Sequence, residues 1–281
     1  MRGLAFFARR FVAGETAPEA VEAGRRLKAR GIAATFDILG EDVLDRAAAV
    51  RCADANKALL RLIPEGLDRN VSIKLTTMGL DVSTDFCLEL TAGVVSEARA
   101  LGGFVRIDME GSKHTEATLD VFRKLRKEHS NVGIVLQAYL HRTEDDVKEA
   151  VGRGDRVRLC KGAYKEPPRL AMQDMREIRA SFKRCARLLL DGGDHPAVAT
   201  HDEELIQDAL DHVRDAKLPP SRYEFQMLFG LRPRRWDSLV AAGHSVRVYV
   251  PFGTHWLPYF YRRLRERREN VFFVLRSLLG G

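Results

Sequence analysis

Short apolar runs alternate along the chain with longer stretches in which apolar residues recur every three or four positions. The short runs are rich in Val, Ile and Leu and lack strict apolar–polar alternation, so they predict strands that are buried on both faces. They occupy residues 32–39, 71–76, 104–109, 132–139, 156–162, 197–201, 223–228 and 246–251. The periodic stretches predict helices over residues 15–30, 41–63, 84–101, 115–129, 143–152, 169–190, 202–214 and 233–242, with a last helix that begins between Thr254 and Pro258.

Eight strand–helix pairs in 281 residues are typical of a (βα)8 barrel. We therefore expect one α/β domain over residues 1–281, with an extra helical segment in residues 1–30 ahead of the barrel. The competing fold is an open doubly wound sheet, which should carry a Gly-rich GxGxxG turn after its first strand. The residues from Asp37 to Asp42 (DILGED) do not fit that turn.

The last predicted helix places two adjacent arginines beside a tyrosine. Tyr259, Arg262, Arg263 and Glu266 fall at i, i+3, i+4 and i+7 and therefore share one face. Paired guanidinium groups form a planar, permanently charged receptor for a carboxylate or a phosphate. A solvated, Arg-rich surface helix explains the same run, but the position directly after a strand and a Gly turn favours the binding interpretation.

The charge balance adds little to this picture. Lys and Arg number 46 against 39 Asp and Glu, which gives a formal net charge of +7. Such an excess suits nucleic acid, an anionic membrane surface or an anionic ligand, and it does not choose among them.

The cysteines and the apolar runs exclude several other classes of protein. Cys52, Cys87, Cys160 and Cys185 lie far apart without CxxC spacing, which is typical of reduced thiols in a cytoplasmic protein rather than of zinc ligands or disulfides. No apolar run approaches the roughly 20 residues that span a bilayer, and residues 1–14 lack a continuous signal-peptide core. We therefore expect a soluble protein that contacts a membrane at most peripherally.

Polar residues gather where the predicted strands end. In a parallel barrel these ends meet at one mouth, where such enzymes carry their chemistry. A charge buried alone costs several kcal/mol, so we expect these side chains to pair with one another or with a ligand, and Lys74 with Asp108 is the most natural ion pair. Any one of them alone suits a structural role, whereas the whole set indicates a site. The set is Asp37, Lys74, Asp108, Glu110, Gln137, Tyr139, Arg158, Lys161, Thr200, His201, Gln226 and Tyr249.

The residues around the fifth and sixth predicted strands limit the kinds of ligand and reaction that the site suits. The small residues Gly162 and Ala163 leave room for a flat ligand to approach the backbone, although a tight turn explains the pair equally well. His201 has no second His or Cys at ligand spacing, so we expect no metal. No GxSxG or comparable nucleophile motif is present. The mouth therefore suits a large, polar, anionic cofactor and a small anionic substrate.

Eight segments of the chain, taken in order, resemble proline dehydrogenase. The similarity is to the monofunctional bacterial type and to the equivalent domain of bifunctional proline utilisation enzymes, and it extends from about residue 30 to residue 270. RLxKGAY and the YxxRR helix are together specific to this family. The segments are SIKLT, RIDMEG, IVLQAYLHRT, RLCKGAYKEP, ATHD, FQMLFG, VYVPFGTHW and YFYRRLRERREN.

The resemblance implies a function as well as a fold. The expected fold is a distorted TIM-type barrel whose final helix lies over the C-terminal mouth. The expected reaction is the FAD-dependent oxidation of L-proline to Δ1-pyrroline-5-carboxylate by hydride transfer to the flavin, the first step of proline catabolism. Electrons would pass to a membrane quinone, ubiquinone or menaquinone, through a peripheral contact with the cytoplasmic membrane face. A separate pyrroline-5-carboxylate dehydrogenase would act downstream, and no nucleic acid partner is expected.

The resemblance also implies a role for individual residues. Asp108 and Arg158 would be catalytic, with Arg158 near the flavin N5. Two features depart from the family: Pro258 directly precedes the arginine helix, and the segment before residue 30 has no counterpart. The proline would be surrounded by Lys74, Asp108, Leu228, Tyr249, Tyr259, Arg262 and Arg263. The FAD would be held by Met109, Gln137, Arg158, Lys161, Gly162, Ala163, Thr200 and His201.

Two alternatives stay open at this point. One is another flavin-dependent barrel enzyme with a different substrate, such as a folate, although the YxxRR helix argues against a bulky substrate. The other is a non-enzymatic basic protein that binds nucleic acid or anionic lipid, for which binding should weaken steeply with salt. A visible absorption spectrum separates the flavoenzymes from the binding protein.

Overall fold

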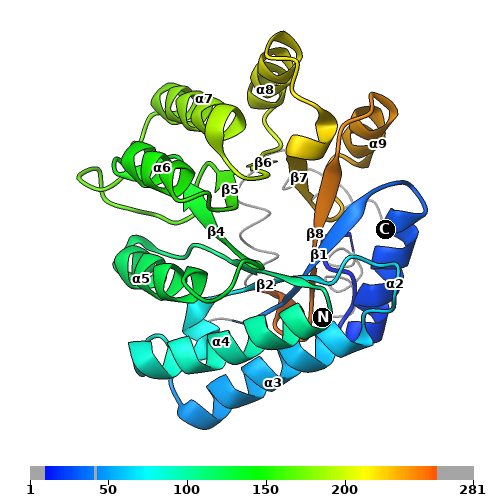
Figure 1. Ribbon diagram of the computed structural model, residues 1–281, viewed down its shortest axis with the longest axis vertical. Helices are drawn as coiled ribbons and strands as arrows, with labels where there is room; N and C mark the ends of the chain where they lie inside the picture. Colours follow the sequence, from blue (N-terminus) through cyan, green and yellow to red (C-terminus); the bar gives the residue numbers. More distant parts are fainter. Residues whose placement is uncertain (1–9, 41–42, 258–281) are drawn as a thin grey trace, which may run out of the picture.

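The computed structural model describes residues 10–40 and 43–257 and shows a closed barrel of eight parallel strands (Figure 1). Neighbours in sequence are neighbours in the sheet, and β8 closes the ring against β1. The (βα)8 barrel expected from the apolar runs is therefore confirmed. The strands are β1 Ala33–Ile38, β2 Asn70–Ile73, β3 Phe104–Ile107, β4 Val132–Gln137, β5 Val157–Cys160, β6 Ala197–Ala199, β7 Glu224–Leu228 and β8 Val246–Phe252.

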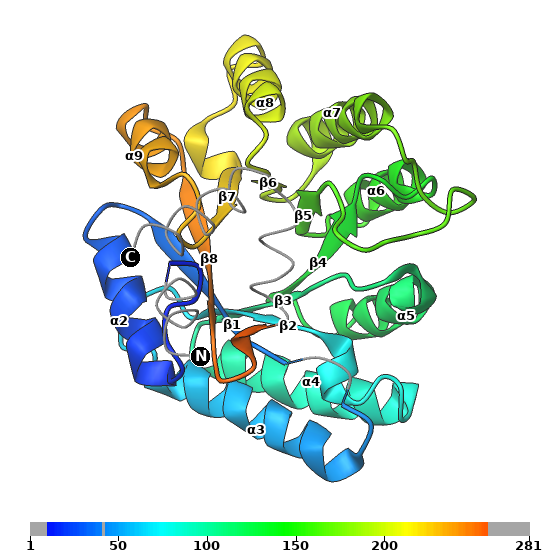
Figure 2. The same cartoon turned by 180° about the vertical axis from the view of Figure 1, so that it is seen from behind.

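Helices form a ring around the strands in both views of the molecule (Figure 1 and Figure 2). The extra N-terminal helix, α2, lies in this ring between α9 and α3 and packs on β1 and β8. The final predicted helix lies largely beyond Leu257, outside the described residues. The described helices are α2 Ala17–Lys28, α3 Arg46–Leu62, α4 Thr84–Ala100, α5 Thr115–Arg126, α6 Thr143–Gly152, α7 Met175–Gly192, α8 Glu203–Asp215 and α9 Pro233–Ala241, with 3-10 turns η1 Leu75–Met78, η2 Ser112–His114 and η3 Pro220–Arg222.

The local sequence explains why α2 forms and how it packs. Thr16 and Glu19 form a capping box, in which the Glu19 carboxylate accepts a hydrogen bond from the backbone N–H of Thr16 at 2.9 Å. One turn further on, Gly24 faces the ring of Phe36 in β1. A Cβ at Gly24 would lie 2.6 Å from the Phe36 Cζ, so the helix can approach the strand this closely because the residue is glycine.

The bounds of the elements differ from the prediction mainly near the mouth. The predicted strand 71–76 ends at Ile73, because the chain turns into η1 at Leu75. The predicted helix 169–190 begins at Met175, where the Asp174 carboxylate caps it by accepting from the backbone N–H of Arg176 at 2.7 Å. The apolar pattern in the sequence extends beyond the hydrogen-bonded residues of β2, because the residues that follow the strand are also buried, as Leu75 and Met78 are.

Hydrogen bonds across the barrel show which side chains point inward. Arg158 of β5 bonds to Asp108, directly after β3, and to Ser72 of β2, while Tyr249 of β8 also bonds to Asp108. These strands are not neighbours of their partners in the sheet, so the bonds run through the barrel interior. Alternate apolar residues face outward against the helices, as Phe36 does against α2. The barrel therefore holds a buried polar centre inside an apolar shell.

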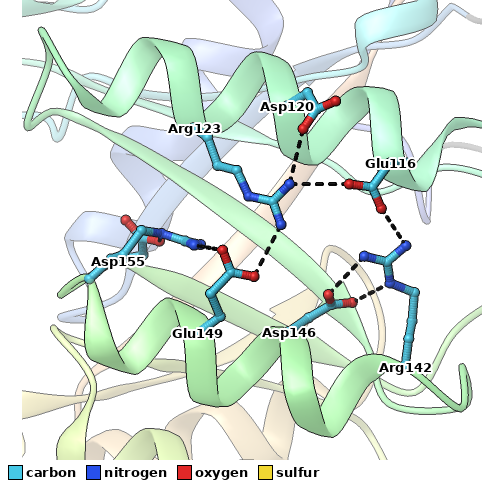
Figure 3. Close-up of polar contacts among 8 residues, drawn as sticks. Glu116, Asp120, Arg123, Arg142, Asp146, Glu149 and Asp155 are labelled. Carbon is cyan, nitrogen blue, oxygen red and sulfur yellow. Dashed lines mark hydrogen bonds and ion pairs between the residues drawn. The ribbon is translucent and has the colours of Figure 1, made fainter.

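An ion-pair network joins α5 and α6 on the outside of the barrel (Figure 3). Arg123 of α5 contacts Glu116 and Asp120 of its own helix and Glu149 of α6, at 3.0 to 3.2 Å. Arg142, directly before α6, reaches back to Glu116 at 2.7 Å. The charges therefore cross between the two helices in both directions.

Candidate active site

The C-terminal ends of the strands bring the two residues predicted to be catalytic into direct contact. Arg158 Nη1 donates to Asp108 Oδ1 at 2.8 Å, and the hydroxyl of Tyr249 donates to Asp108 Oδ2 at 2.8 Å. Arg158 is 6% exposed and Asp108 is 9% exposed. An ion pair buried this deeply is weakly screened, so its charges act strongly on anything bound beside it.

The ion pair predicted between Lys74 and Asp108 is wrong. The Lys74 ammonium instead contacts Asp37 at the end of β1, at 3.1 Å and 3.2 Å from the two carboxylate oxygens. The reason is that both oxygens of Asp108 already accept bonds from Arg158 and Tyr249, which reach across the barrel. Lys74 therefore pairs with the carboxylate on its other neighbouring strand.

The environment of these groups determines their protonation states. Burial alone would lower the pKa of Lys74, but the carboxylates of Asp37 and Asp108 raise it above its ordinary value, so the side chain is a cation at neutral pH. Burial and the nearby Asp108 carboxylate raise the pKa of Tyr249, which keeps the phenol protonated as the donor to Asp108. Burial raises the pKa of Asp37, and the neighbouring Lys74 ammonium opposes that shift. Two adjacent ion pairs, Lys74 with Asp37 and Arg158 with Asp108, therefore lie beneath the mouth.

Three of the residues predicted to hold the cofactor lie together between β5 and β7. Lys161 Nζ contacts Asp202 Oδ2 at 3.0 Å, and the backbone N–H of Asp202 donates to the hydroxyl of Thr200 at 3.1 Å. His201 accepts a hydrogen bond at Nε2 from the backbone N–H of Leu228 at 3.0 Å. Because Asp202 is the N-cap residue directly before α8, this rim combines a basic side chain with a helix N-terminus.

Met109 and Gln137 lie on the neighbouring part of the mouth. Met109 is 7% exposed and Gln137 is 3% exposed. The side-chain amide of Gln137 donates to the backbone oxygen of Glu110 at 2.8 Å, which joins the end of β4 to the residues after β3. This hydrogen bond gives Gln137 a structural role at the mouth, and a role of either residue toward a cofactor stays a prediction.

The turn after β5 has a packing explanation. Gly162 has a φ of +115°, a conformation that favours glycine, and a Cβ there would lie 2.2 Å from the Tyr139 ring. The interpretation of Gly162 as part of a tight turn is therefore sufficient, and close approach of a ligand is not needed to explain it. Ala163, the next residue, is exposed.

Two residues that the sequence reasoning missed lie within the same site. The Ser72 hydroxyl, 1% exposed, accepts from Arg158 Nη2 at 3.1 Å. The Tyr164 ring lies 3.9 Å from the position of a Cβ on Gly111, in the loop that follows β3. The signals were present: Ser72 is two residues before Lys74 and so shares its face of the strand, and Tyr164 ends the KGAY run.

The loop that carries Tyr164 is tied down at several points. The Glu166 carboxylate accepts from the backbone N–H of Ser112 at 2.7 Å and also from the Ser112 hydroxyl. Further along, Leu140 and Ala171 form an antiparallel bridge. The loop between β5 and α7 is therefore fastened to the loops that follow β3 and β4.

Some of the predicted residues cannot be placed. Tyr259, Arg262 and Arg263 lie outside the described residues, so their proposed contact with the substrate stays a prediction. Within residues 10–40 and 43–257, no group of three or more His, Cys, Asp and Glu side chains is arranged to hold a metal ion.

Comparisons with known proteins agree with this geometry. A family model described as proline dehydrogenase matches residues 20–276. Proline dehydrogenase 1 of Bacillus subtilis subsp. natto is 41% identical over 273 residues, which cover 97% of this chain and 90% of the relative. Proline dehydrogenase of Deinococcus radiodurans is 36% identical over 283 residues, covering 98% and 90%.

A solved structure shows the same fold in a longer protein. Proline utilization A (PutA) from Bdellovibrio bacteriovorus, inactivated by N-propargylglycine, superposes with a TM-score of 0.84 at 27% identity. The match covers 92% of this chain and 32% of that structure, so the chain spans about a third of its length. The chain is an enzyme of the proline dehydrogenase family, as the resemblance of its motifs predicted.

Proposed function

We propose that this chain oxidises L-proline to Δ1-pyrroline-5-carboxylate, with FAD as the hydride acceptor. The observation that carries the proposal is the buried group of Arg158, Asp108 and Tyr249 at the C-terminal ends of the strands. Barrel enzymes carry their chemistry at this end. A hydride leaving a carbon beside an amine needs a site that orients the two partners, and a protein nucleophile is not required.

Membership of the proline dehydrogenase family implies a flavin cofactor, and the residues at the mouth fit one. A bound flavin supplies the two-electron acceptor. Arg158 provides a buried cation, which would stabilise negative charge on the reduced ring. Lys161 and Thr200 lie where α8 begins, and a helix N-terminus suits the phosphates of FAD.

The remaining side chains fit a small amino acid. Lys74, Asp108 and Tyr249 present charge and a hydroxyl, and the side chain of Leu228 adds apolar surface at the end of β7. In the proposed arrangement these groups bind the ring of proline and exclude water from it. The substrate carboxylate would be bound by Arg262 and Arg263, as the sequence predicts.

The decisive experiment is anaerobic reduction of the purified protein. The protein is expected to be yellow, to release intact FAD on denaturation, and to bleach on addition of L-proline. D-proline serves as the stereochemical control and should bleach it far more slowly. Colourless protein that takes up no FAD on reconstitution would contradict the flavoenzyme proposal. Bleaching by a reduced folate and not by L-proline would identify a different flavin-dependent barrel enzyme.

The final electron acceptor is a separate part of the proposal. The family resemblance suggests a membrane quinone, reached by peripheral contact with the cytoplasmic membrane face. Among the described residues, none of the helices combines the length and the apolar composition needed to cross a bilayer. Reoxidation of proline-reduced protein by ubiquinone and menaquinone analogues, compared with oxygen alone, tests this part independently of flavin binding.

A further inference from the structure

A row of hydrogen-bonded side chains connects the N-terminal end of the barrel to Arg158. Arg247 of β8 donates from Nε to both oxygens of Glu224, at 3.1 Å and 3.0 Å. Glu224, the first residue of β7, accepts from the side-chain amide of Gln226 on the same strand. The oxygen of that amide accepts from Arg158 Nε. Glu224, Gln226, Arg158 and Arg247 are each at most 9% exposed.

Chemistry allows one orientation of the Gln226 amide in this row. Arg158 has donors and no acceptor, so the amide oxygen must face it. An ionised Glu224 accepts and cannot donate, so the amide nitrogen must face Glu224. Burial alone would raise the pKa of Glu224, but the charge of Arg247 and the Gln226 amide lower it below its ordinary value, so the carboxylate is ionised at neutral pH.

The other contacts of Arg158 show which part of its guanidinium this row of side chains holds. Arg158 Nη1 and Nη2 are held by Asp108 and Ser72, on the side of β3 and β2. Nε is held from the opposite side of the barrel, by Gln226 of β7. Without that bond the guanidinium would keep its charge and its contact with Asp108, but its plane would no longer be fixed at both edges.

We propose that Glu224 and Gln226 are positioning residues that hold the guanidinium of Arg158 in the orientation required for hydride transfer. Glu224 acts through the amide of Gln226, and neither residue needs to touch the substrate or the flavin. This inference rests on the proposed function, in which Arg158 faces the flavin. It assigns to the N-terminal half of the barrel interior a role in the reaction at the mouth.

The test compares Gln226→Met, Glu224→Gln and the double variant with wild type and with Arg158→Met. Gln226→Met removes the acceptor for Arg158 Nε without changing any charge. Glu224→Gln replaces the ionised acceptor of the Gln226 amide nitrogen with a neutral amide, which weakens the bond that holds Gln226 in place. The matched control is Asp68→Asn, because Asp68 contacts Arg247 at 2.6 Å but does not contact Gln226.

The expected result has three parts. The kcat for L-proline falls on the order of 10-fold in each single variant, while KM changes by less than about twofold, because orientation and not binding is lost. The double variant is no slower than either single variant, since both residues act through one link. The reduction equilibrium of the bound flavin shifts about tenfold toward the oxidised form, about 30 mV for a two-electron couple.

The direction in which the flavin reduction potential changes distinguishes this mechanism from a direct effect of the Glu224 charge on the flavin. Removing the Glu224 carboxylate acts through space to favour the reduced flavin, which raises the potential. Losing the aligned Arg158 cation lowers it. A raised potential in Glu224→Gln, or equal effects of Asp68→Asn and Glu224→Gln, would therefore overturn the proposal.

The outcome also separates this inference from the proposed function. If wild type binds no flavin, the proposed function fails first. If Arg158→Met lowers kcat and potential but Gln226→Met changes neither, the proposed function stands and the positioning role is wrong. Thermal unfolding of every variant without flavin shows whether a loss of kcat reflects misfolding, and a variant with wild-type kcat contradicts the proposal whatever its stability.

Discussion

At the residue scale, Arg158 donates from all three of its nitrogen atoms to buried side chains across the barrel, namely Asp108, Ser72 and Gln226. We expect Arg158→Met to lower kcat about 10²- to 10³-fold, the usual effect of removing one preorganised donor. It should also lower the flavin potential and destabilise the fold by about 3 to 5 kcal/mol, because Asp108 loses its buried cation. Arg158→Lys keeps the charge and should restore part of both. Rapid-reaction kinetics and a redox titration measure these effects, and an unchanged potential would place Arg158 away from the flavin.

Two partly buried histidines make the stability of the native state depend on pH. Burial lowers the pKa of His195 and of His244 below the ordinary value. The unfolded chain therefore binds protons near pH 6.5 that the folded chain excludes. The contribution of these two histidines to the stability should be fully present above about pH 6.5 and should be lost as the pH drops through the lowered values.

His195 can be replaced by a residue that suits its backbone conformation. His195 has a φ of +44°, which asparagine tolerates better than most residues. We expect His195→Asn to flatten the loss of unfolding free energy between about pH 7 and pH 5, measured by urea denaturation. His255→Gln, at an exposed position, should leave the slope as in wild type. A steeper slope in His195→Asn would contradict the assignment.

At the element scale, the network between α5 and α6 depends on Arg123, which faces three carboxylates (Figure 3). Arg123→Ala leaves those carboxylates to repel one another, so we expect a loss of about 0.5 to 1 kcal/mol, within the range of partly exposed pairs. The loss should shrink as salt rises, because screening weakens the network and its repulsion alike. Arg214→Ala is the control, since its partners Asp211 and Asp215 both lie on its own helix, and it should give no measurable change. Urea denaturation at low and at high salt measures the loss of unfolding free energy. A loss that does not depend on salt would indicate that Arg123 stabilises the protein through packing instead.

The loop between β5 and α7 is the second element with a clear test. Glu166 bonds it to Ser112, and the Tyr164 ring in the same loop lies beside Gly111. Glu166→Ala should raise hydrogen exchange in residues 163–172 and raise KM for the substrate about 10-fold, with little change in global stability. Gln173→Ala is the control, because its amide bonds within the loop, to the backbone oxygens of Glu166 and Ala171. Unchanged exchange in Glu166→Ala would show that the loop is held mainly by its bridge at Leu140.

At the scale of the whole molecule, the alternation of apolar runs and helical stretches was enough to predict the closed barrel, because each strand is buried on both faces and each helix on one. The same logic predicted which side chains point into the mouth, since the C-terminal ends of parallel strands meet there. It did not predict the pairs. Closure brings β3, β5 and β8 together across the interior, so Asp108 bonds to Arg158 and Tyr249 and leaves Lys74 to Asp37. Periodicity along a chain carries no information on contacts between distant strands. It places Ser72 on the same face as Lys74, but it does not show that Arg158 is the partner of Ser72.

The last question at this scale is whether the segment beyond Leu257 completes the site. If Arg262 and Arg263 bind the substrate carboxylate, each contributes charge-assisted hydrogen bonds of about 1.5 to 3 kcal/mol. Arg262→Ala or Arg263→Ala should then lower kcat/KM for L-proline about 10- to 150-fold, while flavin content stays near that of wild type. Lysine at either position keeps the charge without the planar fork and should restore part of the loss.

The same helix offers its own control. Arg268 is six residues from Arg262 and five from Arg263, so on the predicted helix it lies about 120° and about 140° around the axis from them, opposite the middle of the pair. Arg268→Ala should therefore leave kcat/KM unchanged. If the run were an ordinary solvated surface, all three alanine variants would behave alike, with stability changes within about 0.5 kcal/mol and normal kinetics. Steady-state kinetics with flavin occupancy measured on each sample distinguishes the two cases. Loss of activity with loss of flavin would assign the arginines to the cofactor instead, because a clamp on the substrate carboxylate has no reason to release FAD.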